Sequence, residues 1–314
     1  MTHPATPFGE RGEGTPLVSV VLVTFNRANV LEDTVRSVLA QTLADFELIV
    51  CDDASTDETP IVMAEWAAQD PRILYVRQPR NLKTAGNLRR GVDLAKAEFV
   101  AVLHDSDVYD PRLLERWVAA LRACPEAAFV FNAYNQLDAD GRIEVTYRDR
   151  FDSCVPGRVL LERFYFRRWH FDSPVWGTVM FRKSKYLAVG GYDTRFPFVA
   201  DVDLYLKLAE TNCVAYVPDA LIGLASRETL PRLFSNPQRS VRQAFREARV
   251  RHYLDRPLRL RAEMVRHWTF AAMDVAVGPM LGPADQFRRR LRRRLIQQRP
   301  HDDVAQNVAD WQVT

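Results

Sequence analysis

Apolar residues between positions 16 and 131 follow two periods that alternate along the chain. Val18–Val23 is an almost continuous apolar run, which predicts a strand buried on both faces. The residues after it place apolar side chains at helical spacing, with Asn29 positioned to cap the helix. Such alternation predicts an α/β fold in which helices flank a doubly wound, mostly parallel sheet. By the same patterns we predict further strands at 46–51, 73–76, 99–103 and 128–131, and helices at 59–68, 85–95 and 113–121.

The regular alternation ends near Asn132. Asp140-Gly141 is typical of a turn, and the patterns further on predict strands at 178–181 and 214–217 and a helix at 201–211. Beyond about residue 236 the pattern is helical only. We therefore divide the chain into a mobile leader (1–15), an α/β domain (16–230) and a helical C-terminal extension (231–314).

Polar side chains follow four successive predicted strands. In a parallel sheet, ligands bind outside the carboxyl ends of the strands. Each polar group also has a structural explanation, since Asp52, Ser55 and Asp57 could cap the next helix and Lys83 could be a solvated loop residue. Because all of them fall on one edge of one sheet, we predict a shared polar site built from segments 24–27, 52–55, 81–84 and 104–107.

This edge lacks the usual glycine loops that hold phosphate. Neither the G-x-G-x-x-G pattern of dinucleotide sites nor the G-x-x-x-x-G-K-[ST] loop is found. A bound phosphate would therefore need another positive partner. Asp105 and Asp107 offer hard oxygen ligands suited to Mn²⁺ or Mg²⁺, with coordination positions left for phosphate oxygens.

The order of several motifs resembles the inverting family-2 glycosyltransferases of the GT-A fold. The resemblance covers about residues 16 to 230, and the combination of motifs is more specific than any one of them. It divides the domain into a nucleotide-binding half (16–131) and an acceptor half (132–230). The matching segments are Val18–Arg27, Asp52–Asp57, Asp105–Asp107, Gly190–Asp193 and Asp201–Leu206.

The resemblance implies a reaction and a set of roles. The enzyme would move a sugar from a nucleoside diphosphate, with UDP expected, to an acceptor hydroxyl by single displacement. Asp201 would be the general base, and Asp107 and Asp105 would hold the Mn²⁺ or Mg²⁺. Asp53 would hydrogen-bond the base, usually uracil. The implied nucleotide-sugar-binding residues are Thr24, Asn26, Arg27, Asp53, Lys83 and Asp105.

Some positions depart from the family pattern. His104 and Ser106 stand where acids are common, and Ala200 stands where Glu usually precedes the base. Gly86 replaces an arginine. These departures keep an alternative open, in which the protein is an inert sugar-nucleotide-binding protein or a membrane-surface adaptor. Asp201 itself could be a first-turn acid that the helix dipole favours.

Charge and cysteine content narrow the expected partners and the cellular compartment. The chain has 43 basic and 40 acidic residues, a balance that does not indicate a nucleic-acid partner. Its four cysteines form no C-x-x-C pair, so we expect core thiols in a reducing compartment, with neither a zinc site nor a disulfide. With neither a signal pattern nor an apolar window long enough to span a bilayer, we expect a cytoplasmic protein.

The segment 284–298 predicts a short basic amphipathic helix. Phe287, Leu291 and Leu295 recur at every fourth position among arginines. Such a helix is a candidate for peripheral contact with the inner face of the cell membrane, or it is a solvated face. The acceptor expected from the sequence is a hydroxyl on a glycan, a lipid-linked glycan or a small molecule.

Overall fold

The computed structural model describes residues 14–165, 178–196 and 200–224. The expected leader, the helical extension and its basic segment 284–298 lie outside these residues. Contacts divide the chain into two compact units, and the described residues up to Phe164 and from 178 onward all belong to the first. Within the described part, no helix is long and apolar enough to cross a membrane.

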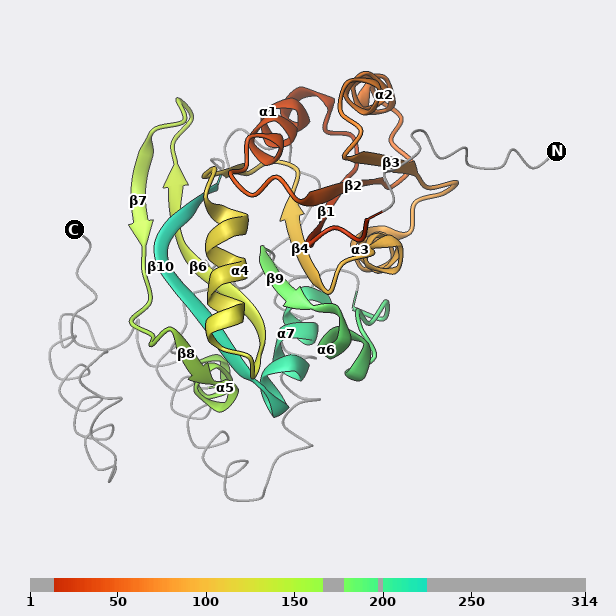
Figure 1. Ribbon diagram of the computed structural model, residues 1–314. Coiled ribbons are helices and arrows are strands. Elements are labelled where there is room, and N and C mark those ends of the chain that lie inside the picture. Colours follow the sequence, from red (N-terminus) through yellow and green to blue (C-terminus); the bar gives the residue numbers. More distant parts are fainter. Residues whose placement is uncertain (1–13, 166–177, 197–199, 225–314) are drawn as a thin grey trace, which may run out of the picture. The chain divides into compact units, whose positions relative to one another are not determined.

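Ten strands of the first unit form one sheet (Figure 1). Its order is β3-β2-β1-β4-β9-β6-β10-β5, with β7 beside β6 and β8 beside β10. Strands β1 to β4 are parallel, whereas β9 runs antiparallel between β4 and β6. The strands are β1 (Val18–Thr24), β2 (Phe46–Asp52), β3 (Ile73–Arg77), β4 (Phe99–His104), β5 (Val108–Tyr109), β6 (Ala127–Leu137), β7 (Ile143–Tyr147), β8 (Cys154–Pro156), β9 (Val179–Arg182) and β10 (Cys213–Leu224).

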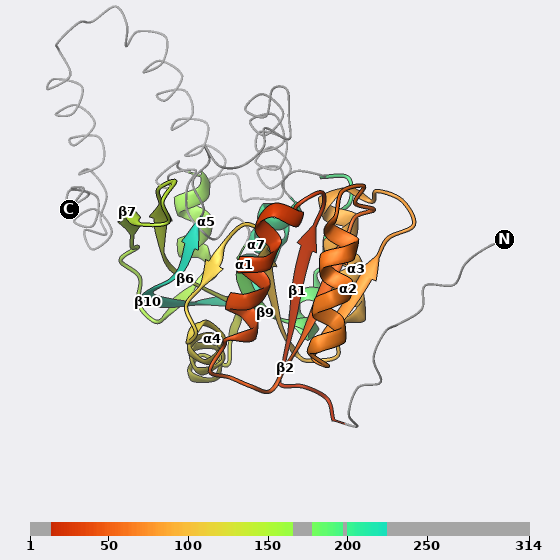
Figure 2. The same cartoon turned by 90° about the horizontal axis from the view of Figure 1, so that it is seen from above.

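Helices cover both faces of this sheet (Figure 2). Val20 and Leu22 of β1 point to one face, where they join a core with α1, α2 and α4. Val21 points to the other face, where α3 approaches so closely that a Cβ on Gly91 would lie 2.4 Å from the Val21 side chain. The helices are α1 (Ala28–Leu39), α2 (Thr59–Gln69), α3 (Lys83–Leu94), α4 (Leu113–Ala123), α5 (Gly157–Tyr165), α6 (Lys183–Ala188) and α7 (Ala200–Thr211).

The second half of the domain completes the sheet. The predicted turn at Asp140-Gly141 joins β6 to β7, and the strands expected at 178–181 and 214–217 are found in β9 and β10. The helix expected at 201–211 is α7. β9 pairs with β4 of the first half and with β6, which in turn pairs in parallel with β10, so both halves share one sheet.

Two expectations about local structure are wrong. Asn29 does not cap α1, which begins at Ala28. Instead the carboxylate of Asp57, from the loop after β2, accepts a hydrogen bond from the Ala28 amide. The expectation of no disulfide fails as well, because Cys124 and Cys154 form one. The pairing of β8 with β10, which the irregular sequence around it did not reveal, brings Cys154 next to the end of α4.

Candidate active site

The predicted polar site lies along the carboxyl edge of β3, β2, β1 and β4. These four strands are neighbours in this order and run parallel, so the loops that follow them emerge side by side. Register places Thr24 opposite Asp52, and Val23 opposite His104. The sequence prediction that these segments share one edge is therefore confirmed.

The loops after β1 and β2 are joined by reciprocal hydrogen bonds. The Asn26 amide donates to the Ser55 hydroxyl at 2.9 Å, and the Asn26 side-chain oxygen accepts from the Thr56 amide at 2.7 Å. Asp57 accepts from Ala28 at 3.1 Å and from the Thr59 amide at 3.0 Å, so one carboxylate serves the starts of both α1 and α2. The Asn26 side chain thus holds the loop that carries Arg27.

Backbone strain is concentrated at the same edge. Three non-glycine residues in the described part of the chain have positive φ, namely Asn26 (54°), Ala54 (65°) and Lys83 (63°). Each follows a different strand of the parallel set. Left-handed backbone costs a non-glycine residue roughly 1–2 kcal/mol and tends to gather at binding sites.

Asp53 organises the third loop. Its carboxylate accepts a hydrogen bond from the Leu82 amide at 2.5 Å, directly before Lys83. Burial raises the pKa of Asp53 despite these backbone donors. The Lys83 residue is exposed at the start of α3. The structure thus places Asp53 and Lys83 at the predicted edge.

The turn after β4 carries the two acids predicted to hold a metal. The Tyr109 hydroxyl donates to the His104 carbonyl at 2.9 Å and accepts from the His104 amide at 2.8 Å, which closes the turn over Asp105 and Asp107. Tyr109 is buried, and together with burial the nearby charges of Asp107 and Asp105 raise its pKa. The Asp107 carbonyl also accepts from the Thr34 hydroxyl of α1 at 2.8 Å.

Arg27 brings a buried positive charge to these acids. Its Nε atom lies 3.9 Å from a carboxylate oxygen of Asp105, and the two side chains are 9% and 15% exposed. The Nη1 atom of Arg27 is buried and has no hydrogen-bond partner among the residues that the structure describes. An unsatisfied buried guanidinium nitrogen suits an anionic ligand such as a phosphate.

The charge of Asp201 acts on buried tyrosines that belong to a packed set. Gly191 has a φ of +67°, and a Cβ there would lie 2.5 Å from the Tyr186 ring, so glycine is required. The Tyr192 amide donates to the Tyr186 hydroxyl at 3.3 Å. The Tyr192 ring packs against Tyr186 at a centroid distance of 5.5 Å, and the charge of Asp201 acts on the buried Tyr192 hydroxyl. The Gly-Gly-Tyr segment is therefore fixed by its packing against Tyr186.

The environment of Asp201 changes its acidity. Burial of its carboxyl raises the pKa to about 7, while its own backbone contacts and the charge of His104 lower it less. His104 also acts on Asp105, whose pKa burial raises. The charge of His104 therefore acts on both Asp201 and Asp105. Asp203, two residues on, is fully buried and pairs with Lys207 at 2.7 Å, as expected for a structural acid.

The sequence did not identify all of the residues that build this edge. His104 stands where the family pattern commonly has an acid, yet its charge acts on two predicted site acids, Asp105 and Asp201. Tyr109 was missed, and Asp57 was recognised only as a cap of the helix that follows it, because their other contacts are tertiary. A buried tyrosine two residues after an acid is a weak signal in sequence alone.

The donor set at Asp105 and Asp107 fits a hard divalent cation. Both are carboxylates, and among the described residues no third acid, histidine or cysteine clusters tightly with them. Two carboxylates leave most of an octahedral coordination sphere for phosphate oxygens and water, as Mg²⁺ and Mn²⁺ sites on phosphate substrates require.

Comparison with solved structures defines the class of fold. S. aureus TarS in complex with UDP-GlcNAc superposes with a TM-score of 0.64 over 86% of this chain and 77% of TarS, at 16% identity. The mannosyltransferase PcManGT of Pyrobaculum calidifontis, in complex with GDP-Man and Mn²⁺, gives a TM-score of 0.56 over 95% of this chain and 85% of its own, at 17% identity. The protein has the GT-A glycosyltransferase fold.

Sequence comparison identifies the family. The model for glycosyl transferase family 2 matches residues 19–187. A Bacillus subtilis protein bearing the name glycosyltransferase EpsE is 29% identical over 64% of this chain and 69% of its own length. Chondroitin synthase of Escherichia coli is 26% identical over 63% of this chain but only 27% of the synthase. The chain belongs to glycosyl transferase family 2 and is a glycosyltransferase.

Proposed function

We propose that this enzyme transfers a sugar from a nucleoside diphosphate, most favourably UDP, to an acceptor hydroxyl by a single displacement. The observation that carries the proposal is Asp201. Its carboxyl has a pKa of about 7, and it feels the charge of His104, which directly precedes the turn that bears Asp105 and Asp107. A carboxylate poised near neutral pH can accept a proton from a hydroxyl in the transition state.

The donor would lie along the loops after β1, β2 and β3. Thr24, Asn26 and Arg27 would line the nucleotide pocket, with Asp53 toward the base and Lys83 toward the phosphates. Because Asn26 and Asp53 already bind backbone amides, part of their contribution is to hold the loops in shape. The TarS and PcManGT structures are complexes with UDP-GlcNAc and GDP-Man, which supports a nucleotide-sugar donor here.

Asp107 and Asp105 would hold Mn²⁺ or Mg²⁺. When bound, such an ion neutralises the charge that builds on the departing diphosphate. Arg27 would hold Asp105 in place through their ion pair and donate its free Nη1 hydrogens to the phosphate. The complex of PcManGT with GDP-Man and Mn²⁺ supports this proposal, because the two proteins share a fold.

Asp201 would take the acceptor proton at a carboxylate oxygen while the hydroxyl attacks the anomeric carbon. Attack opposite the leaving diphosphate inverts the configuration at that carbon. The acceptor would be a hydroxyl of a glycan, a lipid-linked glycan or a small molecule. One of the relatives is a chondroitin synthase, which favours a glycan as the acceptor. Membrane contact through 284–298 stays a prediction.

Turnover and stereochemistry test this proposal together. The full chain would be incubated with Mn²⁺ and a panel of UDP-sugars and GDP-sugars, with water as the surrogate acceptor, while nucleoside diphosphate release is measured. NMR would follow the anomer of the released sugar. We expect turnover of at least one donor with inversion, and a loss of about 10²–10⁴-fold in Asp201→Asn.

The matched control is Asp140→Asn, which changes an exposed acid on the β6–β7 hairpin and should keep the wild-type rate. Unchanged turnover in Asp201→Asn would remove Asp201 as the base. A donor that binds wild type and is never cleaved, with any acceptor supplied, would favour an inert binding protein.

A further inference from the structure

A second cluster of reactive side chains lies at the amino edge of the sheet. Cys213 is the first residue of β10, and Glu126 directly precedes β6. Cys154 opens β8, which pairs with the start of β10. Since β6 and β10 run parallel to β4 in this sheet, their first residues lie at the edge opposite Asp105 and Asp201. The cluster is therefore separate from the candidate active site.

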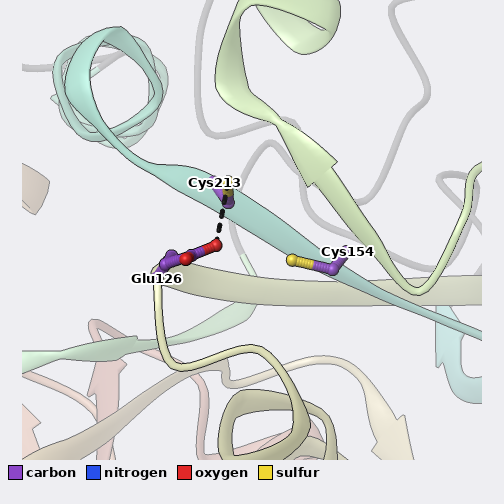
Figure 3. A group of neighbouring side chains, drawn as sticks. All are labelled: Glu126, Cys154 and Cys213. Atoms are coloured by element: carbon purple, nitrogen blue, oxygen red, sulfur yellow. Dashed lines mark hydrogen bonds between the residues drawn. The ribbon is translucent and has the colours of Figure 1, made fainter.

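Three donor atoms converge at this edge (Figure 3). The Cys154 and Cys213 sulfurs and a Glu126 carboxylate oxygen all lie within 4.8 Å of one another. The Cys213 sulfur is 3.9 Å from the nearer Glu126 oxygen. Cys124, which ends α4, adds a third sulfur through its disulfide to Cys154, with 5.9 Å between the two Cα atoms.

We propose that the reduced protein binds one Zn²⁺ at this cluster, through the thiolates of Cys124, Cys154 and Cys213 and the carboxylate of Glu126. Zinc prefers four ligands in a tetrahedron, with thiolate sulfurs at about 2.3 Å and carboxylate oxygens at about 2.0–2.2 Å. The distances between the three donor atoms are at most 4.8 Å. Each atom would have to move by roughly 0.5 Å toward a central ion to reach those bond lengths. Side-chain rotation supplies a shift of that size. After reduction the Cys124 sulfur must also rotate away from the Cys154 sulfur, because two thiolates on one tetrahedral zinc lie about 3.8 Å apart.

The ligand types distinguish this cluster from the acid pair at the active site. Soft thiolates select zinc over the hard cations that the carboxylates of Asp105 and Asp107 suit. With four protein ligands the site would be closed, as structural zinc sites are. The ion would tie the end of α4, β8 and the start of β10 together. β8 leads directly into α5.

Reduction must precede binding, because a disulfide sulfur carries no thiolate charge. A phosphine reductant splits the S–S bond, takes an oxygen atom from water to become the phosphine oxide, and leaves Cys124 and Cys154 as two thiols. Zn²⁺ then displaces the protons of three thiols, which pass to the buffer. In the oxidised protein the disulfide holds the same two segments, so the cluster provides a covalent or a metal link depending on redox state.

Cobalt substitution in the full chain tests the proposal. Metal-free protein, with and without a phosphine reductant, would be titrated with Co²⁺, and thiolate-to-cobalt charge-transfer absorption would be recorded. Zn²⁺ would then be added to displace the cobalt. We expect a band that saturates at one Co²⁺ per reduced chain and is absent from the oxidised chain. Carboxylate sites, including Asp105 and Asp107, do not give this band.

Two variants and one control make the assignment specific. Cys213→Ser should remove part of the band and weaken binding at least about 10–100-fold. Glu126→Gln, at an exposed position, should keep the thiolate band and weaken binding about tenfold. Cys51→Ala, which changes a buried thiol in β2, should leave the titration unchanged.

Three results would overturn the proposal. They are a reduced wild-type chain without the band, a band that Cys213→Ser leaves intact, and equal binding by the oxidised chain. If a rearranged Cys154–Cys213 disulfide formed on partial reduction while no metal bound, the cluster would be a site of thiol–disulfide exchange instead. Since none of these readouts uses the donor or turnover, failure here leaves the proposed transferase activity standing.

Discussion

Replacing Asp201 by Asn should make the folded protein more stable above neutral pH while it removes turnover. The Asp201 carboxyl has a folded-state pKa of about 7, against an ordinary value of 3.8. Between these two pH values the unfolded chain has released its proton and the folded chain still holds it. Rising pH therefore favours the unfolded state in this window, and the effect is constant above about pH 7.

The size of the effect follows from that shift. Moving from 3.8 to about 7 is about three pH units, and each unit is worth 1.36 kcal/mol, so the upper bound is roughly 4 kcal/mol. Relaxation and partial solvent contact of Asp201 reduce this to about 1–3 kcal/mol. For a domain of this size that corresponds to a melting temperature about 2–12 °C higher at pH 8.

Urea unfolding of wild type and Asp201→Asn at a series of pH values would measure the difference. We expect none near pH 3.5 and a growing advantage for the variant up to pH 7. The matched variant Asp203→Asn should instead lose about 1–3 kcal/mol, since it weakens the buried pair with Lys207. If Asp201→Asn were less stable than wild type at pH 8, Asp201 would be an acid that the helix dipole favours, and the argument for a tuned base would fail.

Three further changes test how the edge is built. Gly191→Ala should cost about 2–4 kcal/mol in urea unfolding, because it adds a Cβ against Tyr186 at a positive φ; an unchanged midpoint would contradict the packing described. Asp57→Ala should cost about 1–3 kcal/mol, since two helix starts lose an acceptor, and circular dichroism melting would show it. Ala54→Gly should raise the free energy of unfolding by about 0.5–1 kcal/mol. Glycine relieves the left-handed backbone at this position, and its greater entropy in the unfolded chain offsets part of that gain. A lower free energy of unfolding in calorimetry would argue against strain at Ala54.

The first half of the fold was predictable because its pattern is local. Runs such as Val18–Val23 can be buried on both faces only in a covered parallel sheet, and the expected strands and helices up to residue 131 are present. The antiparallel insertion of β9 between β4 and β6 was not predictable, because four residues carry no information about their neighbours. The same holds for the disulfide, which depends on the partner of β8.

In the candidate site, too, some residues could be predicted from the sequence and others could not. Residues that directly follow strands, such as Asp53 and Asp105, could be placed on one edge from the sequence. Asp57 could be recognised as a cap of the helix after it. Its hydrogen bond with the Ala28 amide at the start of α1 depends on contact between the loops after β1 and β2, which the sequence does not reveal. The environment of Asp201 was not predictable, since its raised pKa depends on burial and on His104, 97 positions earlier in the numbering of the chain.

The central claim is that the carboxyl edge binds a nucleoside diphosphate through a metal on Asp107 and Asp105. Thermal unfolding with UDP, with Mn²⁺ or with EDTA, tests it most directly in wild type, Asp107→Ala and the exposed control Asp140→Ala. At about 100 times its dissociation constant, UDP should add roughly 2.7 kcal/mol of stability to wild type and to the control only with Mn²⁺, and none to Asp107→Ala. No shift with UDP or GDP, or a shift that persists in EDTA and in Asp107→Ala, would contradict the account.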